Sequence, residues 1–223
     1  MTPVWIRQFG GAGDEVARGL ALDATGNVYV AGHTTAAFGG AAYNGGLHDA
    51  FLVKYDNNGV LQWTKIRGTA GDDVAYAVAV AGGNPVVCGS TTGDLAFTNA
   101  GGYDGWVGEY TAAGVYVFER QIGSPGTDEA FAVAADAAGN VYITGSNTAS
   151  MTAHFQGGYD VFAAKYNSAG TRQWIKTLGS AGDEVGLAAA VSGSSVYVIG
   201  GTTTSLAAPS AGGKDIFVAQ FAP

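Results

Sequence analysis

Short runs of apolar and β-branched residues, separated by glycine and asparagine, recur along the whole chain. In the first complete stretch they predict strands over residues 17–23, 28–32, 50–55 and 61–67. Turns rich in Gly and Asn join the first two strands and the last two, which is typical of antiparallel hairpins. No apolar stripe with a period of 3.6 residues persists, so we expect no long helix. The pattern predicts a four-stranded antiparallel meander.

This pattern recurs four times, at intervals of about 56 residues. The unit begins at an aromatic residue, in turn Trp5, Trp63, Phe118 and Trp174. Two acidic positions recur with the same spacing. The first is assigned to Asp14, Asp72, Asp128 and Asp183, and the second to Asp49, Asp104, Asp160 and Asp215. A repeated four-stranded unit predicts the blades of an all-β propeller. We expect one domain over residues 1–223, with repeats at about 5–62, 63–117, 118–173 and 174–223.

The two ends of the chain supply complementary parts of one repeat unit. Residues 4–9 resemble an outermost strand, and residues 215–221 resemble a third strand, so the last unit lacks its outer strand. We therefore expect whole blades, closed by pairing the N-terminal strand with the last blade, which hides open sheet edges. Because the innermost strands are rich in small residues, we favour a four-bladed ring made by a monomer. The alternative is a homodimer, in which two chains exchange end strands and form an eight-bladed ring.

Two of the units carry a fuller motif. Residues 23–32 read Asp-Ala-Thr-Gly-Asn-Val-Tyr-Val-Ala-Gly, and residues 136–145 read Asp-Ala-Ala-Gly-Asn-Val-Tyr-Ile-Thr-Gly. Both are followed by Asp-x-Phe-x-x-Lys-Tyr, at residues 49–55 and 160–166. These motifs closely resemble the bacterial β-propeller repeat family called SBBP, although the second and fourth units depart from it in the first hairpin. The resemblance implies a non-catalytic module of a bacterial surface or secreted protein.

Charge and hydropathy narrow the range of partners. The chain has 18 acidic and 10 basic residues, for a net charge of −8, which is the wrong sign for nucleic acid. We expect no membrane insertion, since no apolar run is long enough to span a bilayer. The N-terminus carries no signal-peptide pattern, so a secreted or cell-surface location would come from a larger bacterial protein. Cys88, the single cysteine, lies in an apolar run and is expected to be buried.

The recurring acids fall in the loops that share one face of a propeller. They could hold Ca²⁺ through carboxylate and loop carbonyl oxygens. Alternatively, each could fix its own glycine-rich loop by accepting backbone N–H bonds. We favour the structural role, because every blade needs the same joint and no dense Asp-x-Asp-x-Asp loop occurs. No cofactor is expected to be required, with Ca²⁺ as the alternative. The metal candidates are Asp14, Asp49, Asp72, Asp104, Asp128, Asp160, Asp183 and Asp215.

Loop residues that differ between the units are the better candidates for binding a ligand or partner. They are His33, Tyr43, His48, Tyr103, His154, Phe155 and Tyr159. Aromatic side chains beside amides suit a sugar or a protein surface, and His33 and His48 with Asp49 would suit a transition metal. No Gly-x-Ser-x-Gly motif or asymmetric carboxylate pair indicates catalysis. We expect no enzyme but a structural or protein-binding module; the alternatives are a carbohydrate- or calcium-binding module and a hydrolase or lyase acting at the channel mouth.

Overall fold

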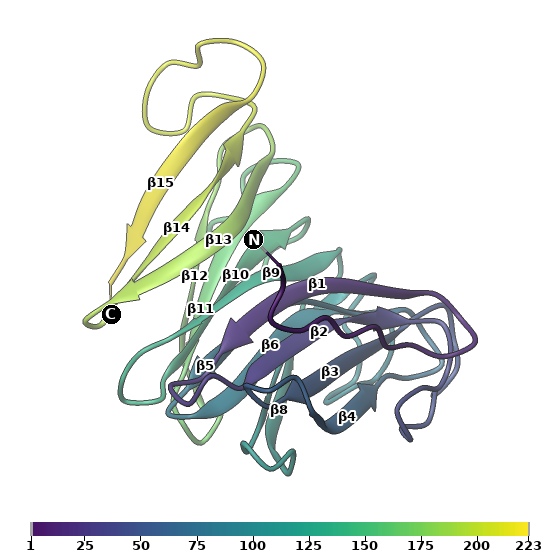
Figure 1. The fold of residues 1–223 in the computed structure, drawn as a ribbon. Helices are drawn as coiled ribbons and strands as arrows, with labels where there is room; N and C mark the ends of the chain where they lie inside the picture. Colours follow the sequence, from purple (N-terminus) through teal and green to yellow (C-terminus); the bar gives the residue numbers. More distant parts are fainter. Residues whose placement is uncertain (1, 223) are drawn as a thin grey trace.

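Fifteen β-strands form four antiparallel sheets in the computed structural model, which describes residues 2–222 (Figure 1). The first sheet contains β1 (Glu15–Leu22), β2 (Val28–Thr34), β3 (Asp49–Tyr55) and β4 (Leu61–Arg67). The second contains β5 (Asp73–Ala81), β6 (Asn84–Thr91), β7 (Asp104–Tyr110) and β8 (Tyr116–Ile122). The third contains β9 (Asp128–Ala135), β10 (Val141–Asn147), β11 (Asp160–Tyr166) and β12 (Arg172–Leu178). The last contains β13 (Glu184–Ser192), β14 (Ser195–Thr202) and β15 (Asp215–Phe221).

Within every sheet the strands follow one another in chain order, as in a meander. The four-blade, all-β architecture expected from the repeats is confirmed. No helix able to cross a membrane occurs among residues 2–222.

The motif Asp-x-x-Gly-Asn forms the turn between the first two strands of a blade. Asp23 Oδ1 accepts a hydrogen bond from the backbone N of Asn27 at 3.0 Å. Gly26 lies between them with a φ of 82°, a conformation that favours glycine. Asp136 and Gly139 repeat this turn in the third sheet. These side-chain bonds set the register of the first hairpin, which is why the motif marks it in the sequence.

A β-bulge interrupts the innermost strand of every blade at the same place. In β5 the register shifts between Ala75 and Ala77, and the carbonyl group just before the bulge points at a glycine of β6. A Cβ atom on Gly89 would lie 1.7 Å from Val74 O. The glycines in this position are Gly32, Gly89, Gly145 and Gly200. The bulge explains why the second strand of each unit requires glycine there.

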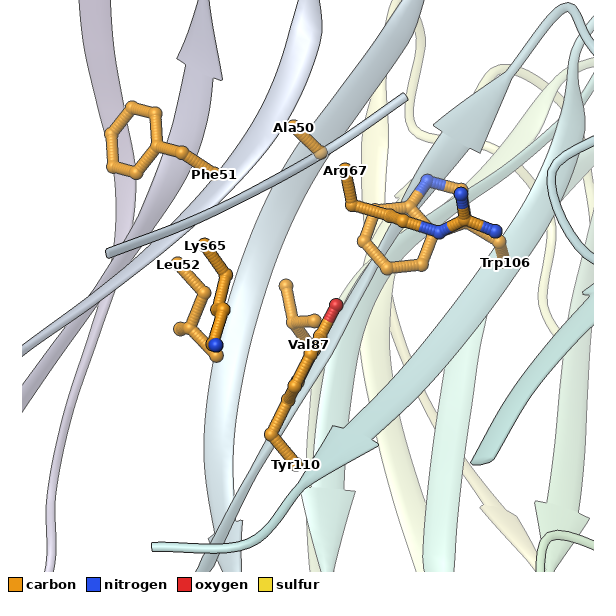
Figure 2. A pocket seen from close by; sticks show the side chains of 8 residues that line it. All are labelled: Ala50, Phe51, Leu52, Lys65, Arg67, Val87, Trp106 and Tyr110. Atoms are coloured by element: carbon orange, nitrogen blue, oxygen red, sulfur yellow. The ribbon is translucent and has the colours of Figure 1, made fainter. Parts of the chain in front are cut away.

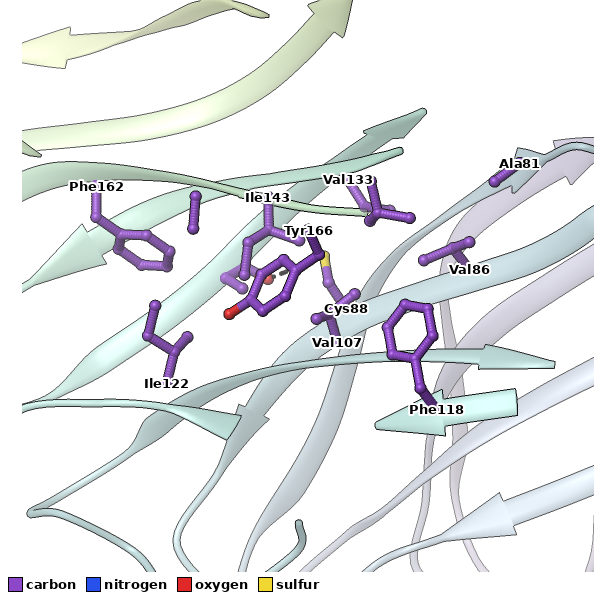
Figure 3. Close-up of a cluster of buried hydrophobic side chains, with 13 residues drawn as sticks. Ala81, Val86, Cys88, Val107, Phe118, Ile122, Val133, Ile143, Phe162 and Tyr166 are labelled. Atoms are coloured by element: carbon purple, nitrogen blue, oxygen red, sulfur yellow. Dashed lines mark hydrogen bonds between the residues drawn. The ribbon is translucent and has the colours of Figure 1, made fainter. Parts of the chain in front are cut away.

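Apolar cores fill the space between successive sheets. Figure 3 shows the core between the second and third sheets, which includes Cys88, Ile122, Ile143 and Phe162. Similar cores join the first sheet to the second and the third to the fourth. The burial expected for Cys88 is confirmed; it raises the pKa of the thiol, and Sγ lies 3.3 Å from the backbone oxygen of Ala130.

The ring closure expected within one chain is absent from the described residues. The last sheet has three strands, and residues 4–9 do not pair with β15. These residues instead lie against the first sheet, where Trp5 Nε1 donates a hydrogen bond to Asn57 O at 3.2 Å and Arg7 Nε donates to Gly59 O at 2.6 Å. The four sheets are arranged one after another like the leaves of an open fan, and the last sheet stands away from the first (Figure 1). Residues 4–9 are held by the β3–β4 turn of the first sheet, so they do not reach β15.

Candidate functional site

The recurring aspartate at the start of each third strand anchors the loop that precedes it. Its Oδ2 accepts a hydrogen bond from a backbone N–H four or five residues earlier in the chain. The four pairs are Asp49 with Asn44, Asp104 with Ala100, Asp160 with Gln156 and Asp215 with Ala211. This geometry supports the structural role, because each carboxylate makes the bond that holds its own loop.

A second acidic position begins each innermost strand. Its members are Glu15, Asp73, Asp128 and Glu184, and each accepts a bond from the backbone N–H four residues earlier. The grouping of Asp128 with Asp14, Asp72 and Asp183 was therefore wrong. Thr127 takes that position, and its backbone N donates to Thr148 Oγ1 as the N of Asp72 donates to Thr92 Oγ1. The third loop reads Gly-Thr-Asp-Glu where the others read Gly-Asp followed by an acid, so the spacing was misread by one residue.

Several of these carboxylates are buried instead of facing solvent. Asp49, Asp104 and Asp160 are at most 1% exposed, and Oδ1 of each is without a hydrogen-bond partner in the described part of the chain. Across residues 2–222, no three His, Cys, Asp or Glu side chains lie close enough together to hold a metal ion. Four of the eight metal candidates, Asp49, Asp104, Asp128 and Asp160, are thus buried loop anchors, whereas Asp14 and Asp183 are exposed.

Burial of these anchors predicts a pH-dependent stability. It raises the pKa of Asp128 from 3.8 to about 6, although hydrogen bonds from Ser124 lower it. The folded state therefore holds this proton more tightly than the unfolded state, and the resulting stabilisation is lost as pH rises from about 4 to 6. We expect Asp128→Asn to remove about 1 kcal/mol of the difference in unfolding free energy between pH 5 and pH 7.5. Urea unfolding at both pH values measures this, and an unchanged difference in the variant would contradict it.

One group of polar side chains joins the first and second blades on the loop face. His48 Nδ1 lies 2.7 Å from Asp72 Oδ1, and the Tyr103 hydroxyl donates to Asp72 Oδ2 at 2.5 Å. The His33 ring lies beside that of His48, with the ring centroids 4.5 Å apart. The structure thus brings together three predicted binding residues and one predicted metal ligand. We call these four residues the histidine cluster.

The backbone fixes where this cluster forms. His48 precedes β3, and its carbonyl oxygen accepts a hydrogen bond from the N–H of Asp73, at the start of β5, at 2.9 Å. Tyr103 and Tyr159 make the same bond to the next blade. This backbone hydrogen bond between neighbouring blades places the His48 ring beside Asp72 of the following blade. The neighbour is therefore not Asp49, as the sequence suggested, because that carboxylate points into its own loop.

The electrostatics of the cluster favour hydrogen bonding over acid–base chemistry. Burial, followed by the charges of His48 and Arg18, lowers the pKa of His33, so this ring is neutral at pH 7. The hydrogen bond to Asp72, together with burial, raises the pKa of Tyr103 to about 12. Because the carboxylate can only accept, Nδ1 of His48 donates to it, which leaves Nε2 for a ligand. The only side-chain hydrogen bond of His48 among residues 2–222 is to Asp72.

The other predicted binding residues lie elsewhere. The Tyr43 hydroxyl donates to Gly46 O of its own loop at 2.9 Å. His154 and Phe155 belong to the loop between β10 and β11, and Tyr159 ends that loop. His154 and Tyr159 are exposed, and Phe155 is half-buried.

Leu47 is a candidate that the sequence analysis missed. It lies next to His48 and is 62% exposed. The other three units have Gly102, Gly158 and Gly213 in this position. A comparison of the blades at this position would have found it, since an exposed leucine replaces a recurring glycine.

The interior offers little space for a small ligand. Figure 2 shows a pocket between the first and second sheets, lined by Arg67, Trp106 and Tyr110 among others. Its volume is about 10 Å³, the size of one water molecule. Wider hollows lie over the last sheet: one of about 420 Å³ is lined mainly by the β14–β15 loop, and one of about 320 Å³ is lined mainly by β14 and β15. Another hollow of about 320 Å³ is lined by the predicted binding residue His154 together with Ile175 and Phe221. The histidine cluster lines none of these hollows and forms part of the surface.

Four meanders stacked as successive blades define a protein of the β-propeller class. Within that class, the model of the SBBP family, a beta-propeller repeat, matches residues 4–39 and 118–148. These segments lie in the first and third units, the two that carry the fuller sequence motif, so the resemblance to SBBP repeats is confirmed. A search of the curated proteins found no match.

Proposed function

We propose that this chain is a non-catalytic β-propeller module that binds a protein partner through its loop face, as part of a bacterial surface or secreted protein. The observation that carries the proposal is the exposed Leu47 beside the histidine cluster. An apolar side chain surrounded by hydrogen-bonding groups suits the core and rim of a protein interface. The rest of the loop face supports this surface rigidly, because the recurring carboxylates fix each loop.

The absence of catalysis is part of the proposal. Propeller repeats of the SBBP type are typically non-catalytic. His48 and the Tyr103 hydroxyl are both hydrogen-bonded to Asp72, which suits a fixed polar surface. The shape of the site also favours a non-catalytic role. The histidine cluster lies on the surface, whereas a hydrolase or lyase would need an enclosed pocket near these groups.

Calcium is not expected to stabilise the protein. Ca²⁺ takes six to eight oxygen ligands. Among residues 2–222, no three His, Cys, Asp or Glu side chains lie close enough together to share a metal ion, so each unpartnered Oδ1 would meet a cation alone. We expect the melting temperature to change by no more than about 1 °C between chelator and millimolar CaCl₂. A rise of several degrees would favour the calcium-binding alternative.

A display screen tests the binding surface. Fragments of bacterial surface proteins are selected on the immobilised chain, and the affinity of each selected fragment is then measured against variants. We expect Leu47→Asp to weaken binding at least tenfold, because it places a charge in the interface core. Val115→Asp is the matched control, since Val115 is 61% exposed in the β7–β8 turn, on the opposite edge of the blades. Equal loss in both variants would contradict the proposal, and Leu47-dependent retention on a glycan array instead would assign the surface to carbohydrate.

A further inference from the structure

Apolar side chains are exposed on the outer faces of the first and last blades. The tail face, on the last sheet, consists of Leu187, Ile199, Ile216 and Val218. The head face, on the first sheet, consists of Val16, Leu20 and Leu22 of β1. Ile216 is 91% exposed and Leu20 is 66% exposed. A hollow of about 320 Å³ lies over the tail face. Exposed apolar surface of this kind marks an interface.

The interior blades show what covers these faces. Counted from the aspartate that starts each third strand, Val218 corresponds to Leu52, Val107 and Ala163, all at most 2% exposed. Counted from the bulge, Leu20 corresponds to Val78 and Val133, both 8% exposed. At each interior junction, the innermost strand of one blade covers the second and third strands of the blade before it, as β5 covers β2 and β3. The tail face is therefore shaped to receive a head face.

The loop charges at the two ends are also complementary. At the interior junctions, the residue before the third strand contacts the acidic loop of the next blade, as His48 contacts Asp72. The last blade carries Lys214 in this position, and the first blade carries Asp14 in the acidic loop; both are exposed. A lysine would therefore meet an aspartate where a tail face meets a head face, which favours this pairing over others.

Residues 4–9 already occupy the place of an outermost strand. The Trp5 ring covers Gly59, as Trp63 covers Gly114 and Phe118 covers Gly170. The SBBP match agrees with this correspondence, since its two segments include Trp5 and Phe118 at or next to their first residue. Residues 4–9 are thus an outer strand separated from its blade, and β15 is a third strand without an outer neighbour.

The curvature of the fan indicates which chain supplies the missing partner. The innermost strands β1, β5, β9 and β13 pack in succession with similar contacts, yet β13 does not pack on β1. Figure 1 shows the last sheet standing away from the first. A tighter turn is opposed near the axis, where a Cβ atom on Gly19 would already lie 2.9 Å from Val78 N. A second copy of the chain can cover both faces without any change in this curvature.

We propose that two copies of this chain join head to tail at both ends and form an eight-bladed ring. In it, residues 4–9 of each copy pair with β15 of the other. Head-to-tail contacts of this kind close into a ring when the rotation permits. By correspondence with the β3–β4 register, Ile6 pairs with Ala219 and Arg7 with Val218 of the other copy.

The mass in solution is the first test. We expect light scattering at micromolar concentration to give about twice the chain mass of 22.4 kDa. Val218→Asp places a charge on the tail face and is expected to weaken association at least a hundredfold, whereas the control Val115→Asp remains dimeric. Circular dichroism verifies that both variants are folded. A monomeric mass for the unaltered chain, or a dimer that survives Val218→Asp in folded protein, would overturn the proposal.

An engineered disulfide separates exchange between chains from closure within one chain. Ile6→Cys combined with Ala219→Cys places two thiols at paired positions. After oxidation, exchange gives a covalent dimer on a non-reducing gel, whereas internal closure gives a cross-linked monomer. The two single-cysteine variants control for random coupling, and the native Cys88 is buried and does not compete. An internally cross-linked monomer as the main product would refute the eight-bladed ring.

Discussion

Gly89→Ala is expected to destabilise the protein by at least about 3 kcal/mol, a large effect for one methyl group. The new Cβ would meet the carbonyl oxygen of Val74 at 1.7 Å. This oxygen belongs to the backbone just before the bulge of β5, so no side-chain rotation can relieve the contact. The strand would have to shift, which breaks its pairing with β6 or the packing of the core around it.

Gly105→Ala is the matched control for this prediction. Gly105 lies in β7 of the same sheet, and its added Cβ would find its nearest neighbour at 3.4 Å. We expect a change within about 1 kcal/mol there. Urea unfolding of the two variants measures the difference, and a similar cost at both positions would show that the bulge carbonyl is not the cause.

The bulge also explains a row of large side chains along the innermost strands. The extra residue in successive blades is Arg18, Tyr76, Phe131 and Leu187. The rings of Tyr76 and Phe131 lie 5.1 Å apart, and the Arg18 guanidinium lies 5.9 Å from the Tyr76 ring centroid. The row ends at Leu187, which is exposed on the tail face. In the proposed ring, the next member after Leu187 would be Arg18 of the other copy.

The sequence predicted the parts of the fold that depend on local pattern. The strands, the turns at Asp23 and Asp136 and the aromatic start of each unit all follow from a repeat of about 56 residues. The Trp63 ring packs on Gly114 of the next blade, so the aromatic residue of one blade contacts the blade that follows it. Such features recur because every blade must form the same turns and pack against its neighbours in the same way. A recurring pattern can be recognised in a single sequence.

Features that depend on contacts between blades were not predictable in the same way. The pairing of His48 with Asp72 joins two units, and no spacing within a unit reveals it. The one-residue offset at Asp128 needed the backbone bonds of Thr127 to be seen. The preference for a four-bladed ring rested on small inner residues, but the angle between blades depends on how whole sheets pack. That angle is what leaves β13 apart from β1.

The second large effect is expected at the junction of the first two blades, where Arg67→Ala should cost about 2–3 kcal/mol. Arg67 Nη2 donates to Glu119 Oε2 at 2.8 Å and to Leu95 O at 2.6 Å. Burial raises the pKa of Glu119, and the hydrogen bonds and charge of Arg67 oppose this shift. Without Arg67, the buried carboxylate would have no compensating charge and would take up a proton more readily. We therefore expect the loss of stability to grow as pH rises from 5 to 8, since only the ionised form of Glu119 needs its partner.

The next junction along the fan supplies the control for this pair. There, Ile122 and Ile175 occupy the positions of Arg67 and Glu119 and pack in an apolar core. The double variant Arg67→Ile with Glu119→Ile copies that junction and should unfold within about 1 kcal/mol of the unaltered protein, because no charge is left buried. Urea unfolding of the single and double variants at pH 5 and pH 8 measures both expectations. A double variant as unstable as Arg67→Ala would mean that the ion pair itself, and not the avoidance of an unpaired charge, stabilises this junction.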